Sequence, residues 1–360
     1  MMVPMTDSPR AALTRIPLDS LSGRAQRVLD GVDDLLLHAL PMNVRFRRVT
    51  SRDGLLLHGP SGWSEAAPFW DYDPVESSTW LAGALDVATA PRRAVLRDEV
   101  PVNVTIPVVS PESARTRVLE SGGCATAKVK VADPGSTLDE DVARVRAVAE
   151  ALRETVGDAA KVRVDANAAW DVEQAVRAIT ALDEAAEAAG GLQYCEQPCP
   201  TVPELAEVRG RVRAAIAADE SIRRASDPLA VARAGAADVA VIKIAPLGGI
   251  ERALRIGEET GLRLVVSSAL ESSIGLSVGV RAAASLPADE SGEVLACGLA
   301  TGRLLGADVV AEPLLPAGGV LPVHDFAPDP SLLDRPVDPV LVDRWRDRLE
   351  AMCAALEGSR

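Results

Sequence analysis

From residue 100 onward, short apolar runs rich in β-branched residues alternate with longer stretches of helical periodicity. The short runs predict strands at 102–109, 125–131, 162–165, 192–196, 214–219, 239–244, 264–268 and 293–297. The longer stretches predict helices, of which the clearest are 138–156, 172–189, 203–212, 229–234, 250–259 and 274–286. Strands that alternate with helices in this way are typical of βαβ units, so we expect an α/β fold with a parallel sheet.

The number and spacing of these strands favour a closed barrel over an open doubly wound sheet. A parallel barrel with its helices takes about 250 residues, and eight strands fall here within about 200. An open sheet more often carries a glycine-rich phosphate-binding turn after its first strand. No such motif follows residues 102–109, and no P-loop occurs in the chain.

The first 100 residues show no such regularity. Residues 43–58 predict two strands joined by a turn at Asp53-Gly54, because Asp-Gly is a frequent turn between paired strands. The segment 59–74 is rich in Gly, Pro and aromatic residues, and 76–89 predicts a helix. The change in pattern near residue 100 therefore predicts a domain boundary.

The tail from residue 310 is rich in proline and ends in a predicted helix at 339–356. We expect this tail to fold back over the first segment of the chain. The expected domains are thus residues 1–100 together with 310–360, and a barrel domain at 101–309.

Composition and charge narrow the class of protein. The chain has 52 acidic and 38 basic residues, a formal net charge of −14, which disfavours nucleic acids and anionic membranes as main partners. It has no long uncharged apolar run and no signal-like start, so we expect neither a membrane span nor secretion. Five scattered cysteines do not indicate a disulfide framework. We therefore expect a cytoplasmic globular protein.

Polar residues gather where the predicted strands end. In a parallel barrel the functional groups come from the C-terminal ends of the strands. In chain order these positions hold Lys128 and Lys130, Asp165 and Asn167, Glu196 and Gln197, Asp219 and Glu220, Lys243, and Ser267 and Ser268. The order of lysines, three acids and a further lysine predicts one shared site.

The three acids in this set, Asp165, Glu196 and Asp219, predict a metal site. Carboxylates brought together without a partner would repel, and burying each would cost several kcal/mol. A hard divalent cation removes that cost, and an all-oxygen ligand set favours Mg²⁺ over zinc. A single Asp at a strand end is more often a helix N-cap or a turn residue, an interpretation that fits Asp171 and Asp227.

The lysines predict proton chemistry beside that metal. Strand alternation places Lys128 and Lys130 on the same, inward face, and Lys243 would lie across the metal from Lys130. A metal takes up negative charge on an enediolate, and a lysine whose pKa is lowered by nearby positive charge takes the proton. This arrangement suits proton abstraction next to a carboxylate.

Six segments that carry these residues resemble a known family. They are AKVKV (127–131), VRVDANAAW (162–170), YCEQP (194–198), AADES (217–221), VIKIAPLGG (241–249) and SSALESSIG (267–275). Over most of residues 100–300 the chain is similar to the enolase superfamily, in its muconate-lactonizing subgroup, for which a lysine base with Mg²⁺ is the known pattern. The resemblance implies a (β/α)7β barrel with an N-terminal α+β capping domain.

The resemblance also implies a role for each residue. Asp165, Glu196 and Asp219 would bind one Mg²⁺, and Lys130 would remove the α-proton and then protonate the departing hydroxide. Lys243 would stabilise the intermediate from the opposite face, and Lys128 would support Lys130. The segment 59–74 has the position of the family's specificity loop.

Several further residues are candidate substrate contacts. Ser64, Glu65 and Phe69 belong to the expected specificity loop, and Ser267 follows the seventh strand. Asn167 fits either a turn or a group that orients a ligand. Gly248 could expose backbone N–H groups to a carboxylate or could form a tight turn. Cys195 and Cys199 flank Glu196 but lack two further Cys or His partners nearby, so we expect buried thiols.

Within the subgroup, the resemblance implies a hydro-lyase that acts on a small dicarboxylate. The reaction would be the syn-dehydration of 2-succinyl-6-hydroxy-2,4-cyclohexadiene-1-carboxylate to o-succinylbenzoate in menaquinone biosynthesis. The alternative is an N-succinylamino acid racemase or dipeptide epimerase, in which Lys130 and Lys243 act as bases on opposite faces. A remote alternative is a binding protein that keeps the barrel without catalysis.

Overall fold

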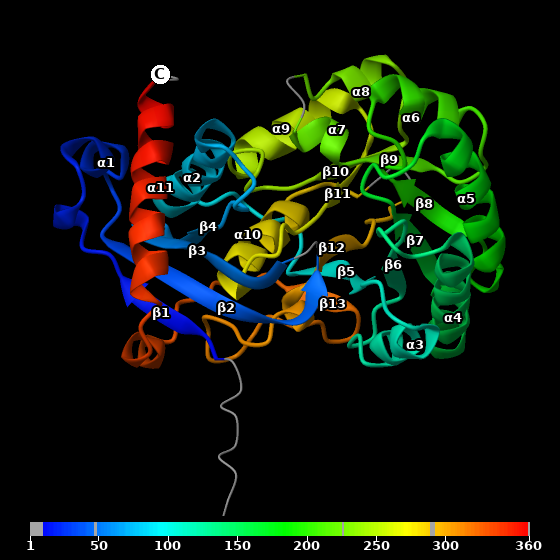
Figure 1. Ribbon diagram of the computed structural model, residues 1–360, viewed down its shortest axis with the longest axis horizontal. Coiled ribbons are helices and arrows are strands. Elements are labelled where there is room, and N and C mark those ends of the chain that lie inside the picture. Colours follow the sequence, from blue (N-terminus) through cyan, green and yellow to red (C-terminus); the bar gives the residue numbers. More distant parts are fainter. Residues whose placement is uncertain (1–9, 47–48, 225–226, 289–291, 359–360) are drawn as a thin grey trace, which may run out of the picture.

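The computed structural model describes residues 10–46, 49–224, 227–288 and 292–358. An antiparallel sheet from the N-terminal part of the chain lies at one end of the molecule, and β/α units lie at the other (Figure 1). The expected domain limits of 1–100, 101–309 and 310–360 stay a prediction. No helix within the described ranges combines the length and apolar character that crossing a membrane needs.

The described residues form a nearly closed barrel of eight parallel strands. These are β5 (Glu99–Ile106), β6 (Thr126–Lys130), β7 (Lys161–Asp165), β8 (Leu192–Glu196), β9 (Ile216–Ala218), β10 (Val239–Ile242), β11 (Arg263–Val266) and β12 (Cys297–Ala300). They pair in chain order, and β12 returns to pair with β5. A bridge between Ser267 and Gly298 links the ends of β11 and β12. The predicted parallel barrel with a capping sheet is therefore confirmed.

Helices cover the outside of this barrel (Figure 1). They are α3 (Pro111–Leu119), α4 (Leu138–Val156), α5 (Val172–Ala185), α6 (Val202–Arg209), α7 (Glu220–Arg223), α8 (Ala230–Arg233), α9 (Ile250–Thr260) and α10 (Ser273–Ala284). Capping boxes begin α4 at Thr137 and α5 at Asp171, which confirms the prediction that Asp171 is a helix cap. The apolar helix faces and the outward strand residues form one core.

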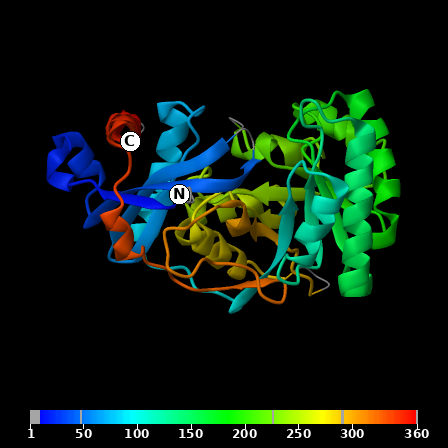
Figure 2. The same ribbon diagram turned by 60° about the horizontal axis from the view of Figure 1, so that its bottom comes forward.

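The N-terminal sheet has the order β1 (Ala12–Arg15), β2 (Asp34–Phe46), β3 (Val49–Gly59) and β4 (Gly62–Ala66), and all its pairs are antiparallel. The helices α1 (Gly23–Val28) and α2 (Pro74–Thr89) belong to the same region. The C-terminal helix α11 (Pro339–Gly358) lies beside them, as both views show (Figures 1 and 2). A short strand, β13 (Val320–Pro322), pairs antiparallel with β5.

The predicted turn at Asp53-Gly54 is wrong, because both residues lie inside β3. The strands β2 and β3 instead pair from Asp34 with His58 to Phe46 with Val49. A Cβ on Gly54 would lie 2.4 Å from the Cβ of Ala67, so glycine here permits close packing. Asp53 accepts hydrogen bonds from the indoles of Trp345 (2.5 Å) and Trp70 (3.0 Å). In this dipeptide Gly54 therefore allows close packing, and Asp53 provides a buried hydrogen-bond acceptor.

The eighth barrel strand begins later than predicted, at Cys297 rather than at residue 293. Its sequence includes Gly298. Because glycine has a low strand propensity, the pattern of apolar residues does not predict a strand there. A Cβ on Gly298 would lie 2.5 Å from the Oγ atom of Ser267, so a larger residue there would displace the Ser267 side chain. The predicted helix at 229–234 shortens to one turn, α8, and α3 has no counterpart among the clearest predicted helices.

Candidate active site

The strand register brings the predicted site residues to one end of the barrel. Lys130 on β6 pairs with Asp165 on β7, and Asp165 pairs with Glu196 on β8. Asp219 directly follows β9, and Lys243 directly follows β10. Because parallel strands end on the same side, these five side chains lie around one space.

Each carboxylate in this space contacts a lysine. Lys130 donates to Asp165, and the Nζ of Lys128 lies 2.8 Å from a Glu196 oxygen and 3.7 Å from an Asp165 oxygen. Lys243 donates to Asp219 at 2.5 Å. All three carboxylates are at least 99% buried, so these contacts supply the positive charge that their burial requires.

Three further residues complete the charged cluster. Arg223 donates to Asp219 at 2.8 Å and to Glu220 at 2.6 Å. Asn167 accepts from Lys130 at 2.9 Å and donates to Glu220 at 3.3 Å, in a left-handed conformation (φ 47°) that Asn tolerates. Asn167 therefore sits in a turn and also orients Lys130.

Burial and charge shift the pKa values of several groups in the cluster, Lys128 and Glu196 among them. Burial disfavours the ammonium form of Lys128, but the charges of Glu196 and Asp165 outweigh it, so the pKa of Lys128 lies above its ordinary value. Burial, reinforced by the charge of Asp165, raises the pKa of Glu196 to about 7. The Oε1 atom of Glu196 is buried without a hydrogen-bond partner within the described part of the chain. That oxygen is free to accept a further ligand.

A divalent cation fits this donor set, although the described residues include no preformed group of three His, Cys, Asp or Glu side chains around one point. The carboxylates of Asp165, Glu196 and Asp219 are hard oxygen donors, the type that Mg²⁺ prefers. The Oε1 atom of Glu196, which has no hydrogen-bond partner within the described residues, is available to bind the cation. In the described structure, lysine ammonium groups balance the carboxylates.

The small number of lysines in the chain supports a specific role for those in this cluster. The chain has four lysines, and three of them, Lys128, Lys130 and Lys243, line this one cavity. The fourth, Lys161, is exposed at the start of β7. Arginine supplies nearly all other positive charge, but a guanidinium does not release its proton in proteins, whereas a lysine can. Buried lysines at these positions can therefore transfer a proton as well as supply positive charge.

The three lysines and Asp165 line one cavity at this end of the barrel. Its wall opposite the carboxylates comes from the segment after β11 and from the cap. The lining residues include Phe69, Thr105, Ser267, Ser268, Ala269, Leu270 and Thr301. Two predicted substrate contacts, Phe69 and Ser267, thus share the cavity with the lysines.

Two other predicted contacts lie elsewhere. Ser64 is buried in β4, and its hydroxyl donates to the carbonyl of Ala84 at 2.7 Å. Gly248 and Gly249 have positive φ, and a Cβ on Gly249 would lie 3.3 Å from Gly83 on α2. Neither Ser64 nor Gly248 lines the lysine cavity, and the glycine pair instead lets the barrel pack against α2.

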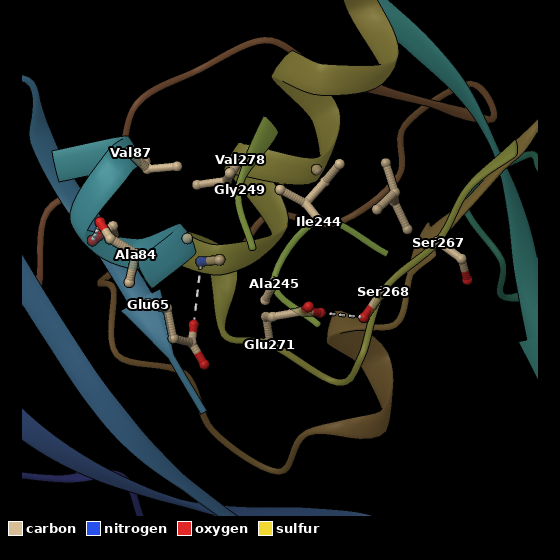
Figure 3. A pocket seen from close by; sticks show the side chains of 15 residues that line it. Glu65, Ala84, Val87, Ile244, Ala245, Gly249, Ser267, Ser268, Glu271 and Val278 are labelled. Carbon is tan, nitrogen blue, oxygen red and sulfur yellow. Dashed lines mark hydrogen bonds between the residues drawn. The ribbon is translucent and has the colours of Figure 1, made fainter. Parts of the chain in front are cut away.

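A second, small pocket lies beside the lysine cavity, between the cap and the barrel (Figure 3). Ser267 and Ser268 line both pockets, and Ser268 donates to Glu271 at 2.7 Å. Glu65, which precedes the cap segment that carries Phe69, accepts from the backbone N–H of Gly275 at 3.2 Å. The two acids face the small pocket, so it disfavours an anion.

Glu65 joins the cap to the start of α10. It accepts from the N–H and the hydroxyl of Ser272, and the Nε2 of His38 lies 3.3 Å away. Burial opposes its ionisation, but the contacts to His38 and Ser272 outweigh burial and lower its pKa. We expect Glu65→Ala to lower the unfolding free energy by about 3 kcal/mol, because it leaves several buried donors unpaired.

Urea unfolding followed by circular dichroism measures this effect. The control is Glu150→Ala, at an exposed position on α4, which we expect to change the unfolding free energy by less than about 0.5 kcal/mol. Equal stability of the two variants would contradict the assigned role of Glu65.

The cysteines carry no metal site in the described residues. Cys195 and Cys199 are free and buried, as predicted. Burial raises the pKa of Cys199 to about 12, which keeps its thiol protonated.

Comparison with known proteins identifies both parts of the chain. Residues 111–328 match the model of the enolase C-terminal domain-like family, and residues 37–88 match the enolase N-terminal domain-like family. The first match covers more than half of the chain.

The chain is similar to several o-succinylbenzoate synthases. It is 51% identical to that of Thermobifida fusca, over 89% of this chain and 96% of the relative. It is 49% identical to that of Mycolicibacterium smegmatis, over 90% of this chain and 98% of the relative. The similarity thus spans the cap, the barrel and nearly all of each relative.

Solved structures share the fold at lower identity. An L-Ala-D/L-Glu epimerase from Bacillus subtilis has a TM-score of 0.64 and 21% identity, over 90% of this chain and 98% of its own. A muconate cycloisomerase from Pseudomonas fluorescens has a TM-score of 0.64 and 23% identity, over 90% and 97%. At this identity the likeness shows the fold alone.

Proposed function

Because the chain belongs to the o-succinylbenzoate synthases of the enolase superfamily, we propose that it dehydrates 2-succinyl-6-hydroxy-2,4-cyclohexadiene-1-carboxylate to o-succinylbenzoate with Mg²⁺, in menaquinone biosynthesis. Membership in this family makes the chain a hydro-lyase. The observation that carries the proposed mechanism is the placement of three of its four lysines beside three buried carboxylates. We further propose that it acts in the cytoplasm on this small dicarboxylate, without nucleic acid or membrane partners.

Asp165, Glu196 and Asp219 would hold the cation. When bound, Mg²⁺ supplies positive charge against the oxygen that becomes negative as the α-proton leaves. The ionised forms of these acids and Glu220 carry four negative charges, which Lys128, Lys130, Lys243 and Arg223 can balance. A divalent cation makes the cluster net positive, which favours a dianionic substrate and a neutral lysine.

Lys130 performs both proton transfers in this proposal. Its neutral amine takes the proton from C1, next to the ring carboxylate, and the electron pair moves into the carboxylate as an enediolate. The pair then returns as the C6–O bond breaks, and the Lys130 ammonium protonates the departing hydroxide to water. One lysine on one face suffices because the elimination is syn, and the ring becomes aromatic.

The other polar groups position and stabilise. Lys243 follows β10, four strands along the barrel from the β6 strand that carries Lys130, and it holds its positive charge beside Asp219. Asn167 accepts from Lys130 and aims its Nζ at the cavity. Phe69 and Ser267 would contact the substrate from the cavity wall.

The decisive experiment follows the absorbance of the cyclohexadiene in the presence of Mg²⁺ and of excess chelator. We expect its loss with Mg²⁺ and none with chelator. No loss under either condition would contradict the proposed function.

The second candidate is racemisation of N-succinylamino acids or epimerisation of dipeptides. The two lysines lie on β6 and directly after β10, four strands apart in the barrel of eight, and this placement favours the second candidate, since two bases on opposite faces can invert a carbon. Rapid deuterium exchange at the α-carbon of an N-succinylamino acid, without dehydration of the cyclohexadiene, would establish this activity instead. The non-catalytic alternative does not agree with relatives that are synthases at 46–51% identity.

Lys243→Arg separates the two candidates. It keeps a positive charge but removes a group that can exchange a proton. We expect dehydration to fall by no more than about 100-fold and α-proton exchange from the Lys243 face to fall below detection. Parallel measurement of both rates on the same preparation checks this. Equal loss of both rates would contradict a purely electrostatic role for Lys243.

A further inference from the structure

A buried arginine of the cap, Arg52 on β3, joins two segments that line the lysine cavity. It is 4% exposed, and its donors reach carbonyls in both segments. Its Nη2 donates to Ala67 in the cap at 2.5 Å and to Ala269 in the barrel at 3.4 Å, and its Nε donates to Leu270 at 3.0 Å. One guanidinium therefore bridges the segment that carries Phe69 and the segment after β11.

Arg52 also lies over the ring of Phe69, with its central carbon 4.3 Å from the ring centroid. The stack is a cation–π contact in a water-poor setting, where such contacts are strongest. Phe69, Ala269 and Leu270 all line the cavity that holds Lys130 and Lys243. Of the residues that Arg52 contacts in this way, only Ala67 does not line the cavity, and it lies two positions before Phe69.

The barrel segment that Arg52 holds is strained. Leu270 has φ of 66°, in the left-handed region that a leucine rarely adopts. The strain persists because Arg52 binds its carbonyl, and the hydroxyl of Ser268 accepts from its N–H at 2.8 Å. A branched residue held in such a conformation at a site wall requires supports of this kind.

We propose that Arg52 is a positioning residue, which fixes Phe69 and the 269–270 wall against the lysines and thereby sets the fit for the substrate. The consequence for substrate rests on the proposed function. A planar guanidinium has donors for two segments at once, which a lysine ammonium at the same stem cannot match. The charge of Arg52 also faces three acids, Glu65, Glu271 and Asp53. Arg52→Lys keeps that charge but removes the planar set of guanidinium donors. It therefore distinguishes the effect of the hydrogen-bond geometry from the effect of the charge.

The test compares Arg52→Lys with wild type by hydrogen–deuterium exchange and by steady-state kinetics. We expect faster exchange in residues 67–73 and 268–271. We expect KM for the cyclohexadiene to rise about tenfold and kcat to change less than about threefold, since the wall binds substrate but moves no proton.

The matched control is Arg163→Lys. Arg163 is fully buried, donates to the carbonyl of Ala296 at 2.6 Å and lies over Tyr194, but neither of these contacts lines the cavity. We expect it to lower thermal stability and leave KM unchanged.

Each outcome decides the proposal. Unchanged exchange in both segments of a folded Arg52→Lys protein would overturn the positioning role, and an unchanged KM would overturn its effect on substrate. If the wild type failed to dehydrate the cyclohexadiene, the proposed function would fail. The exchange comparison would still decide the role of Arg52, because it needs no substrate.

Discussion

Replacement of Lys130 by alanine is expected to lower the rate of dehydration by about 1000-fold, within the range that general acid–base groups contribute. The reason is that Lys130 takes the α-proton and returns it to the departing hydroxide. Lys130→Arg should be equally inactive, because a guanidinium keeps the charge beside Asp165 but does not accept a proton. Initial rates of absorbance loss at saturating Mg²⁺ measure both variants.

Lys161→Ala is the control for this prediction. Lys161 is the one lysine outside the cavity, exposed at the opposite end of the strand that ends in Asp165. We expect its rate to stay within about threefold of wild type, as for most surface substitutions. Calorimetric titration with Mg²⁺ shows whether Lys130→Ala still holds the cation. A variant that binds Mg²⁺ and dehydrates at the wild-type rate would exclude Lys130 as the base.

The chain order of the polar residues was enough to predict that they lie close together, because successive strands of a parallel barrel are neighbours in space. Parallel strands end at one face, so residues at successive strand ends must become neighbours. The pairs of Lys130 with Asp165 and of Asp165 with Glu196 are direct results of this register. No knowledge of side-chain conformation was needed for these residues.

Residues that act through the cap could not be found in this way. Arg52 precedes its barrel partner Leu270 by 218 positions, and no periodicity connects them. Arg223 is in a helix of four residues after β9, and its contact with Asp219 depends on how that turn leaves the strand. The signal that was available for Arg223 is its spacing of four from Asp219, which allows contact within one helical turn.

The segment 59–74 shows where pattern and structure diverge. Its Gly, Pro and aromatic residues predict a single loop, yet Gly62–Ala66 forms the strand β4. The hydroxyl of Ser64 on this strand donates a hydrogen bond to a backbone carbonyl of α2, whereas the side chain of Phe69, five residues later, lines the cavity. Which side chain faces the site depends on the alternation of side chains along the strand and on the turn that follows it. The composition of the segment does not predict either of these.

Loss of one carboxylate should remove the cation and the activity together. We expect Asp219→Asn to weaken Mg²⁺ binding by more than about 100-fold, since even residues that only support metal ligands are worth about 10–100-fold. The neutral amide also removes the negative charge that Asp219 presents to the ammonium of Lys243 and the guanidinium of Arg223, so these two buried cations repel the metal more strongly.

Asp171→Asn is the matched control for this substitution. Asp171 caps α5 at an exposed position, and Asn caps a helix equally well, so neither Mg²⁺ binding nor rate should change. Isothermal titration with Mg²⁺ reports binding directly, without substrate, and the absorbance assay reports activity on the same samples. Wild-type Mg²⁺ affinity in Asp219→Asn would show that the cation is held by other groups. Lost affinity with retained dehydration would show instead that the charge of the lysines alone stabilises the enediolate.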